Sequence, residues 1–211
     1  MPRRTSSPSI LTIEEWIEKS KDIVIKQRIA SDAYSMAYPA VRSHFMCINN
    51  LDWDAAVIGL HLVYGWMPTI PRLSKIMRWE DKQKQQLLSC LNDARNGKVP
   101  DVHHLHTLKS FCNNSLVGGS KLLHFLNPER FPIWDSRVAK VFLQKPNVQS
   151  QKVNSIEVWN IYRETLAGWQ ATPRVQAKCE ELKRLGIFLG GVTYLRLIEL
   201  VMFHTTTSKQ R

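Results

Sequence analysis

Apolar residues recur along this chain at the three- and four-residue spacing of amphipathic helices, and no stretch shows the two-residue alternation of a half-buried strand. The clearest apolar stripe covers 53–64, directly after Asp52, which is well suited to cap a helix. The pattern predicts an all-α protein of about eight to ten helices. Further helices are expected over 41–48, 72–79, 80–96, 102–112, 120–126, 136–143, 156–170, 173–186 and 192–203.

Capping residues and helix breakers set the expected ends of these helices. Thr12 and Glu15 have the spacing of a capping box, which begins the first helix. A short helix from about residue 31 is expected to break at Pro39, because proline removes a hydrogen bond from a helix interior. Glycine and proline punctuate 65–71, and 144–154 is polar, so both segments are expected to be loops.

Composition limits the class of protein. The chain has 211 residues, 44% of them hydrophobic, which suits one domain with a proper core. We expect a single helical domain over 11–204, flanked by a flexible basic arm over 1–10 and a flexible tail over 205–211. No apolar run is long enough to span a membrane, and the N-terminus lacks a signal-peptide core. Four cysteines without a C-x-x-C pair argue against a zinc or iron–sulfur site and suggest a reducing cytoplasm.

The charge points to a polyanionic partner. The formal net charge is +11, and nucleic acids bind such proteins because each neutralised phosphate releases counterions. A membrane surface is a weaker alternative, since no helix is both strongly basic and strongly amphipathic. A third interpretation is that the charge serves only solubility.

Two charged residues stand at successive predicted helix starts. Lys121 begins the helix over 120–126, and Asp135 precedes the helix over 136–143. Residues 116–119, Leu-Val-Gly-Gly, are expected to form a turn. Backbone N–H groups at a helix N-terminus bind anions, so this turn predicts a phosphate-binding site. The candidate DNA contacts are Gly118, Gly119 and Ser120 in the turn, and Arg137 and Lys140 on the following helix.

This order of motifs resembles the helix–hairpin–helix DNA glycosylase superfamily, which includes endonuclease III and the 8-oxoguanine glycosylases. In that superfamily a glycine-containing hairpin precedes the lysine of the lyase-active members, and a catalytic aspartate follows at the next helix start. The resemblance covers 101–143 and implies that Lys121 matches the lysine and Asp135 the aspartate. It implies a glycosylase-like helical fold, compatible with two lobes and a cleft between them. The iron–sulfur cysteines of the endonuclease III branch are absent, so we expect no cofactor and no metal.

The resemblance implies a DNA glycosylase that binds double-stranded DNA as a monomer, flips out a damaged or hypermodified base and cleaves its N-glycosidic bond. A glycosylated base of viral DNA is one such substrate, so DNA repair and antiviral defence both stay open. A carboxylate stabilises the positive charge that develops on the sugar. A neutral lysine amine, favoured by a desolvated site, can attack the anomeric carbon and form an imine, which also permits AP-lyase cleavage.

Several large side chains are candidates for a base pocket or wedge. They are Tyr64, Trp66 and Met67 near the expected loop, Trp134 beside the aspartate, and His124 on the lysine helix. Each also has a simpler role in the core, while Asp135 has one as a helix cap and Lys121 as a surface charge. Two alternatives to a glycosylase stay open: a non-enzymatic DNA-binding protein that uses the hairpin as a phosphate clamp, and a protein-interaction module.

Overall fold

The computed structural model describes residues 10–67, 69–184 and 191–206. These ranges are helical and contain no strand, which confirms the predicted all-α class. They hold 13 helices, more than expected. The helices are α1 (Ile13–Ser20), α2 (Ile23–Ser31), α3 (Ala33–Met46), α4 (Trp53–Trp66), α5 (Leu73–Ile76), α6 (Asp81–Arg95), α7 (Val102–Phe111), α8 (Leu116–Leu126), α9 (Ser136–Phe142), α10 (Ser150–Val153), α11 (Ile156–Gln170), α12 (Pro173–Lys183) and α13 (Tyr194–Thr205).

The ends of the chain lie mostly beyond this description. Of the expected arm over 1–10 and tail over 205–211, only residues 10, 205 and 206 belong to the described ranges. Within those ranges, no helix has both the length and the apolar character needed to cross a bilayer.

The N-terminal third holds more helices than the pattern predicted because aspartates restart the chain. The side chain of Asp22 accepts a hydrogen bond from the Val24 N–H and caps α2, and Asp32 caps α3 in the same way. The expected break at Pro39 was wrong, because α3 continues through it. Tyr38, beside the proline, is buried, and α3 packs on α4 and α8. Packing therefore outweighs the missing backbone hydrogen bond.

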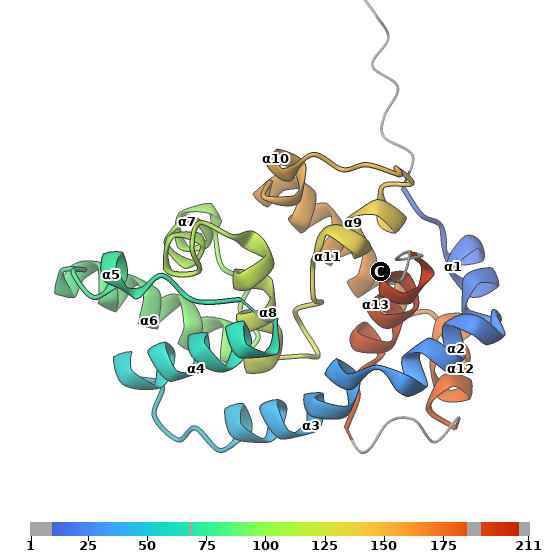
Figure 1. Cartoon of the computed structure of the whole chain (residues 1–211), viewed down its shortest axis with the longest axis horizontal. Coiled ribbons are helices and arrows are strands. Elements are labelled where there is room, and N and C mark those ends of the chain that lie inside the picture. The colour runs from blue at the N-terminus through green and yellow to red at the C-terminus, as the bar shows by residue number, and fades with distance from the viewer. Residues whose placement is uncertain (1–9, 68, 185–190, 207–211) are drawn as a thin grey trace, which may run out of the picture.

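The helices form two groups, which lie side by side in Figure 1. We call α3–α8 the central lobe, in which α8 packs on α3, α4, α6 and α7. We call α1, α2 and α9–α13 the terminal lobe, in which α13 packs on α1, α2, α9, α11 and α12. The chain passes between the lobes at Asp32, where α2 meets α3, and again along 127–135, which joins α8 to α9. Residues near these two crossings can therefore meet from both lobes.

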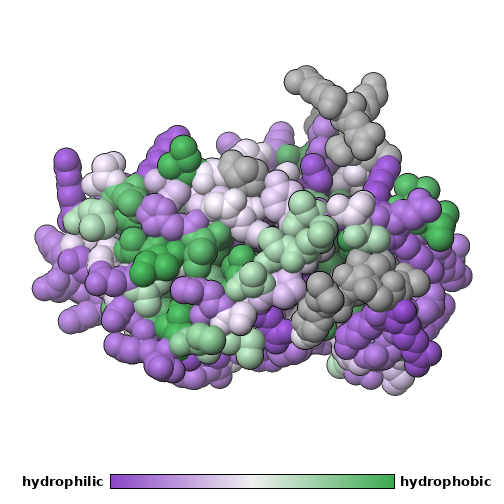
Figure 2. Space-filling view, turned by 60° about the horizontal axis from the view of Figure 1, so that its bottom comes forward, coloured by the Kyte–Doolittle hydropathy of each residue, from purple (hydrophilic) through white to green (hydrophobic). Residues whose placement is uncertain are grey.

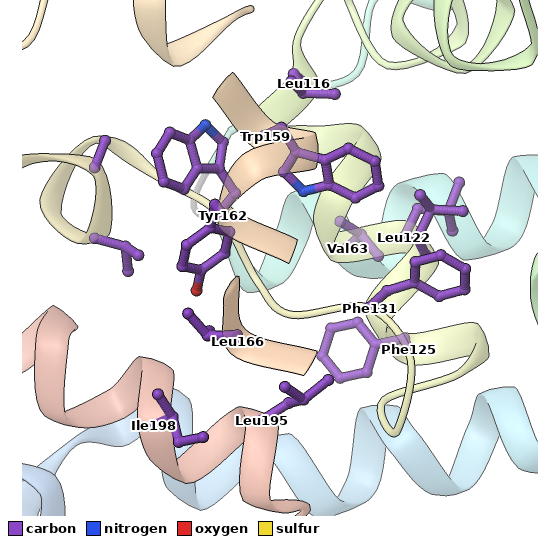
Figure 3. Packing of buried hydrophobic residues seen from close by; sticks show 14 of the residues in the cluster. Val63, Leu116, Leu122, Phe125, Phe131, Trp159, Tyr162, Leu166, Leu195 and Ile198 are labelled. Carbon is purple, nitrogen blue, oxygen red and sulfur yellow. The ribbon is translucent and has the colours of Figure 1, made fainter. Parts of the chain in front are cut away.

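One hydrophobic cluster runs through both lobes. Figure 3 shows Phe125 of the central lobe and Leu166 of the terminal lobe in this cluster, with Phe131 beside Phe125. Phe131 and Trp134 belong to the second crossing, and both are fully buried. The crossing segment is thus part of the core, which fixes its position between the lobes.

The turn between α7 and α8 differs from the prediction. Helix α8 begins directly after Ser115, whose Oγ accepts a hydrogen bond from the Gly118 N–H at 3.2 Å. Residues 116–119 are therefore helical, and the expected glycine turn was wrong. The chain reverses one step earlier, at Asn113 and Asn114, where φ is 56° and 57°. Asparagine tolerates this left-handed conformation better than most residues do.

The glycines serve close helix packing instead of a turn. A Cβ atom added to Gly118 would lie 2.7 Å from the Tyr64 hydroxyl oxygen, and one added to Gly119 would lie 3.2 Å from Leu108. Gly118, Gly119 and Ser120 are all buried. The prediction that these three residues contact DNA phosphates was therefore wrong, because no phosphate can reach their backbone.

The face in Figure 2 has a mostly polar rim and a large apolar area within it. Figure 2 shows hydrophobic side chains gathered left of centre on the face that includes α4. Ile58 on α4 and Met46 on α3 are among the exposed large hydrophobic residues. This area follows from the composition of α4, which is apolar on more than the side that it buries.

Candidate active site

A pocket of about 200 Å³ lies where the two lobes meet. Its walls come from α3, α4 and α8 of the central lobe, from α9 and α13 of the terminal lobe, and from both crossings. It is lined by Asp32, Tyr34, Trp66, Met67, Lys121, Ile133, Asp135, Arg137, Arg196, Glu199 and Phe203. Lys121 and Asp135, which the sequence singled out, therefore share one pocket although they belong to different lobes.

Lys121 projects from the middle of α8 and is partly buried. Its Nζ atom lies 5.5 Å from the centre of the Trp66 ring, and it forms no hydrogen bond or ion pair with any residue in the described ranges. Burial is the main reason why the pKa of Lys121 is lowered, and the carboxylates of Asp135 and Glu199 partly oppose this effect. The amine thus has no hydrogen-bond or ion-pair partner in the described ranges. Its lowered pKa makes the neutral, nucleophilic form more accessible than it is in an exposed lysine.

Asp135 stands at the N-terminus of α9. Its Oδ1 atom accepts hydrogen bonds from the N–H groups of Arg137 and Val138, both at 2.9 Å. These two bonds hold the carboxylate in a fixed position at the start of the helix. Asp135 is therefore a helix cap, as the simpler interpretation held, and it also presents a fixed negative charge to the pocket.

Neighbouring residues join the lysine and the aspartate across the lobes. Ser120, which precedes Lys121, accepts a hydrogen bond at its Oγ from the Trp134 N–H at 3.1 Å. The same hydroxyl lies 3.2 Å from the Trp134 carbonyl oxygen. Trp134 directly precedes Asp135, so this buried connection fixes the two charged residues relative to each other. Ser120 thus has a positioning role and not the expected phosphate contact.

Further hydrogen bonds hold the crossing segment. The Tyr162 hydroxyl donates to the Ile133 carbonyl at 2.9 Å. His124 Nδ1 donates to the Phe131 carbonyl at 2.7 Å, which leaves Nε2 to accept from the Tyr38 hydroxyl at 2.8 Å. Burial lowers the pKa of His124 to about 3, so this ring is neutral. The segment is therefore rigidly held by side chains of both lobes.

The deep wall of the pocket carries an ion pair that sequence reasoning missed. Arg196 and Glu199, one turn apart on α13, are hydrogen-bonded to each other and almost fully buried. The Arg196 guanidinium also lies 5.4 Å from the Trp66 ring centre. Burial raises the pKa of Glu199 to about 7, although Arg196 acts in the opposite direction. Two opposite charges in an otherwise apolar stripe were the available signal for this pair.

Aromatic residues form the rest of the walls. The Trp66 indole N–H donates to the Tyr34 carbonyl at 3.0 Å, which fixes that ring, and Met67 ends α4 beside it. Across the pocket the Arg137 guanidinium lies 4.7 Å from the Phe203 ring centre. Trp66 and Met67 line the pocket, but Trp66 is the last residue of α4 and does not belong to the expected loop. Tyr34 and Phe203 were missed because their helices lie far from the motif in sequence.

Three residues expected in a base pocket belong to the core. Tyr64 is helical, and its hydroxyl donates to the Cys112 carbonyl at 2.8 Å. The Trp134 indole N–H donates to the Val153 carbonyl at 2.8 Å. His124 is fully buried, and both of its ring nitrogens form hydrogen bonds. The prediction that Tyr64, Trp134 and His124 line the pocket was therefore wrong, because each buries its polar atom on a backbone or side-chain partner.

Lys140 lies outside this pocket, on the next turn of α9 after Arg137. It lines a separate surface groove together with Lys19 and Lys145. Arg137 is exposed and lines the pocket itself. Of the two expected phosphate ligands on α9, only Arg137 stands next to Asp135 and the pocket.

Comparisons of the chain with protein-family models, with curated proteins and with solved structures found no match. The function is therefore inferred from the pocket and its residues.

Proposed function

We propose that this protein is a DNA glycosylase that removes a modified base from double-stranded DNA. One observation carries the proposal: an unengaged, partly buried lysine and a fixed carboxylate meet in a pocket between two lobes. The resemblance of 101–143 to helix–hairpin–helix glycosylases assigns catalytic roles to the same two residues, Lys121 and Asp135.

The pocket suits one flipped nucleotide. Its volume of about 200 Å³ is below the roughly 300–1,000 Å³ of most ligand pockets, which favours a single ring system over a larger ligand. Trp66 and Phe203 offer stacking surfaces, and the buried ion pair of Arg196 and Glu199 offers hydrogen-bonding groups. Enzymes that act on a base in duplex DNA flip it into a pocket of this kind.

Lys121 serves as the nucleophile in this proposal. Its neutral amine attacks C1′ of the sugar, the bond between C1′ and the base breaks, and the electron pair leaves with the base, which takes up a proton. Loss of a proton from the attached nitrogen and opening of the sugar ring then give an imine between Lys121 and C1′. The lowered pKa of Lys121 increases the fraction of neutral amine available for the attack.

Asp135 stabilises the positive charge that develops on the sugar as the bond to the base breaks. A carboxylate already fixed by two backbone hydrogen bonds needs no reorganisation during the reaction. Its connection through Trp134 and Ser120 keeps it at a set position relative to Lys121. The proposal needs no cofactor, and the proposed enzyme acts as a monomer. We place it in the cytoplasm, because a reducing compartment keeps cysteines such as the four free ones of this chain in the thiol form.

The structure weakens one rival. A non-enzymatic DNA-binding protein was expected to clamp phosphates with Gly118, Gly119 and Ser120, and all three are buried. That rival would need another DNA contact surface. A protein-interaction module stays the other alternative, and it predicts no salt-dependent affinity for DNA.

Base release tests the proposal. Duplexes carrying a panel of natural and modified bases are incubated with the protein, and abasic sites are counted. We expect release from at least one modified duplex, and a loss of about 100-fold or more in Asp135→Asn, the scale of a lost electrostatic contact in an active site. Asp101→Asn is the matched control, because Asp101 caps α7 through the His104 N–H far from the pocket. Full release by Asp135→Asn would refute the assigned role.

A further inference from the structure

A second cavity adjoins the pocket. It encloses about 380 Å³ and shares four lining residues with the pocket: Asp32, Tyr34, Arg137 and Phe203. We call it the arginine notch, since Arg28 and Arg137 both line it. Because the two cavities share a wall, the notch is within reach of the backbone of a nucleotide whose base lies in the pocket.

Each of the two arginines has a contact within the protein and keeps guanidinium N–H groups that can bind a ligand. Arg28 donates one hydrogen bond to the His204 carbonyl at 3.1 Å, and the Arg137 guanidinium is held 4.7 Å from the Phe203 ring centre. Neither forms an ion pair with a carboxylate of the described ranges. A guanidinium has five N–H donors in a planar fork that matches two phosphate oxygens. Two guanidinium groups that line one cavity therefore suit a phosphate.

The remaining charges in the notch do not cancel this preference. Asp32 supplies one carboxylate, and its Oδ2 accepts hydrogen bonds from the N–H and the hydroxyl of Ser35, both at 2.8 Å. His204 is only 8% exposed, and its Nε2 lies 3.9 Å from Asp32 Oδ2 without a hydrogen-bond partner in the described part of the chain. The notch thus contains two cations against one engaged carboxylate, and an imidazole nitrogen that lacks a partner.

We propose that the arginine notch binds a phosphodiester of the DNA chain next to the flipped nucleotide. The inference rests on the proposed glycosylase function and specifies where its substrate's backbone lies. Arg137 lies two residues after Asp135 in the sequence, so a phosphate bound by Arg137 lies beside the sugar on which Asp135 acts. The notch therefore takes the phosphate-binding role that the sequence assigned to 118–120.

A binding experiment tests this subsite without knowledge of the excised base. The probe is a DNA duplex with one tetrahydrofuran abasic-site analogue, and its affinity is measured over a range of salt concentrations. Arg28→Gln is expected to raise the Kd about tenfold, the effect of a lost charge-assisted hydrogen bond, and to reduce the salt slope by about 0.9. Arg78→Gln removes the same charge from an exposed site in the central lobe and is expected to change the Kd less than threefold, within the usual range for surface substitutions.

A chemical change in the DNA locates the contact. A neutral methylphosphonate replaces, in turn, each phosphate that flanks the analogue. At one of these positions we expect wild-type binding to weaken about tenfold, and binding by the Arg28→Gln, Arg137→Gln double variant to stay unchanged, because the arginines and the phosphate act as one unit.

The outcomes separate this inference from the proposed function. Equal weakening of the wild type and the double variant at every position would overturn the subsite. Saturable binding of inorganic phosphate at constant ionic strength, without any methylphosphonate effect, would assign the notch to free phosphate and also overturn it. Absence of salt-dependent binding to the analogue duplex would instead contradict the proposed function.

Discussion

Gly118→Ala tests the packing that replaced the predicted turn. In the structure Gly118 is inside α8, and an alanine Cβ would lie 2.7 Å from the Tyr64 hydroxyl oxygen. Forcing a methyl group into a packed core costs about 1–3 kcal/mol, while alanine returns about 1 kcal/mol of helix propensity. We expect a net loss of up to about 2 kcal/mol in the free energy of unfolding, which lowers Tm by up to roughly 8 °C in a chain of this size.

A glycine in open space gives the matched control. Gly168 is inside α11, and no described atom lies within 4 Å of a Cβ added there. Gly168→Ala is therefore expected to raise the free energy of unfolding by about 0.5–1 kcal/mol. The same substitution thus has opposite signs at two helical glycines, and the packing around each decides the sign.

Removing the Tyr64 hydroxyl identifies the contact. Tyr64→Phe loses the hydrogen bond to the Cys112 carbonyl and is itself destabilising. In its background Gly118→Ala is expected to cost less, because the nearest atom is gone. Thermal and denaturant unfolding followed by circular dichroism measure all four variants. A rise in Tm for Gly118→Ala would refute the reasoning, because it would show that the space around Gly118 can hold a methyl group.

Three other substitutions probe the site's support and its titration. Ser120→Ala leaves the buried Trp134 N–H without a partner, and we expect a loss of about 1–3 kcal/mol in unfolding free energy together with slower base release; unchanged stability would contradict the connection. Trp134→Phe is expected to lower Tm in denaturation experiments by leaving the Val153 carbonyl unpaired, whereas a drop in base release alone would restore Trp134 to the base pocket. Glu199 has a folded pKa of about 7 against an ordinary 4.5, so the folded wild type holds more protons between these pH values and loses stability as pH rises through them. Glu199→Gln removes the titratable carboxyl group, so the Tm of this variant is expected to fall less over this pH range than the Tm of the wild type. If the slope of Tm against pH were the same in both proteins, Glu199 would not have the raised pKa.

Local signals predicted several helix starts correctly. Thr12 and Asp52 cap the helices that follow them, as expected, because an N-cap bond involves only neighbouring residues. The glycine pair misled for the opposite reason. Whether Gly118 makes a turn or a close contact depends on Tyr64, which another helix supplies.

The site was predictable where its residues belong to one stretch of sequence. Lys121 and Asp135 are close in the chain, and the short segment between them limits how far apart they can lie. Arg196, Glu199 and Phe203 belong to α13, far from that stretch in the sequence, and the fold brings them to the pocket. Their apolar neighbours favoured the interpretation of this helix as ordinary core. Burying two charged side chains in such a helix is costly unless they pair with each other. Two opposite charges one turn apart in an apolar helix therefore indicate a buried ion pair.

Trapping of the imine tests the central claim most directly. A duplex with a natural abasic site is incubated with the protein and sodium borohydride, and the reduced adduct is detected as a protein–DNA band. We predict a covalent adduct with the wild type and with Lys82→Ala, an exposed lysine on α6, and no adduct with Lys121→Ala. An adduct that persists in Lys121→Ala would contradict the account, because another amine, such as the N-terminus, would then be the nucleophile.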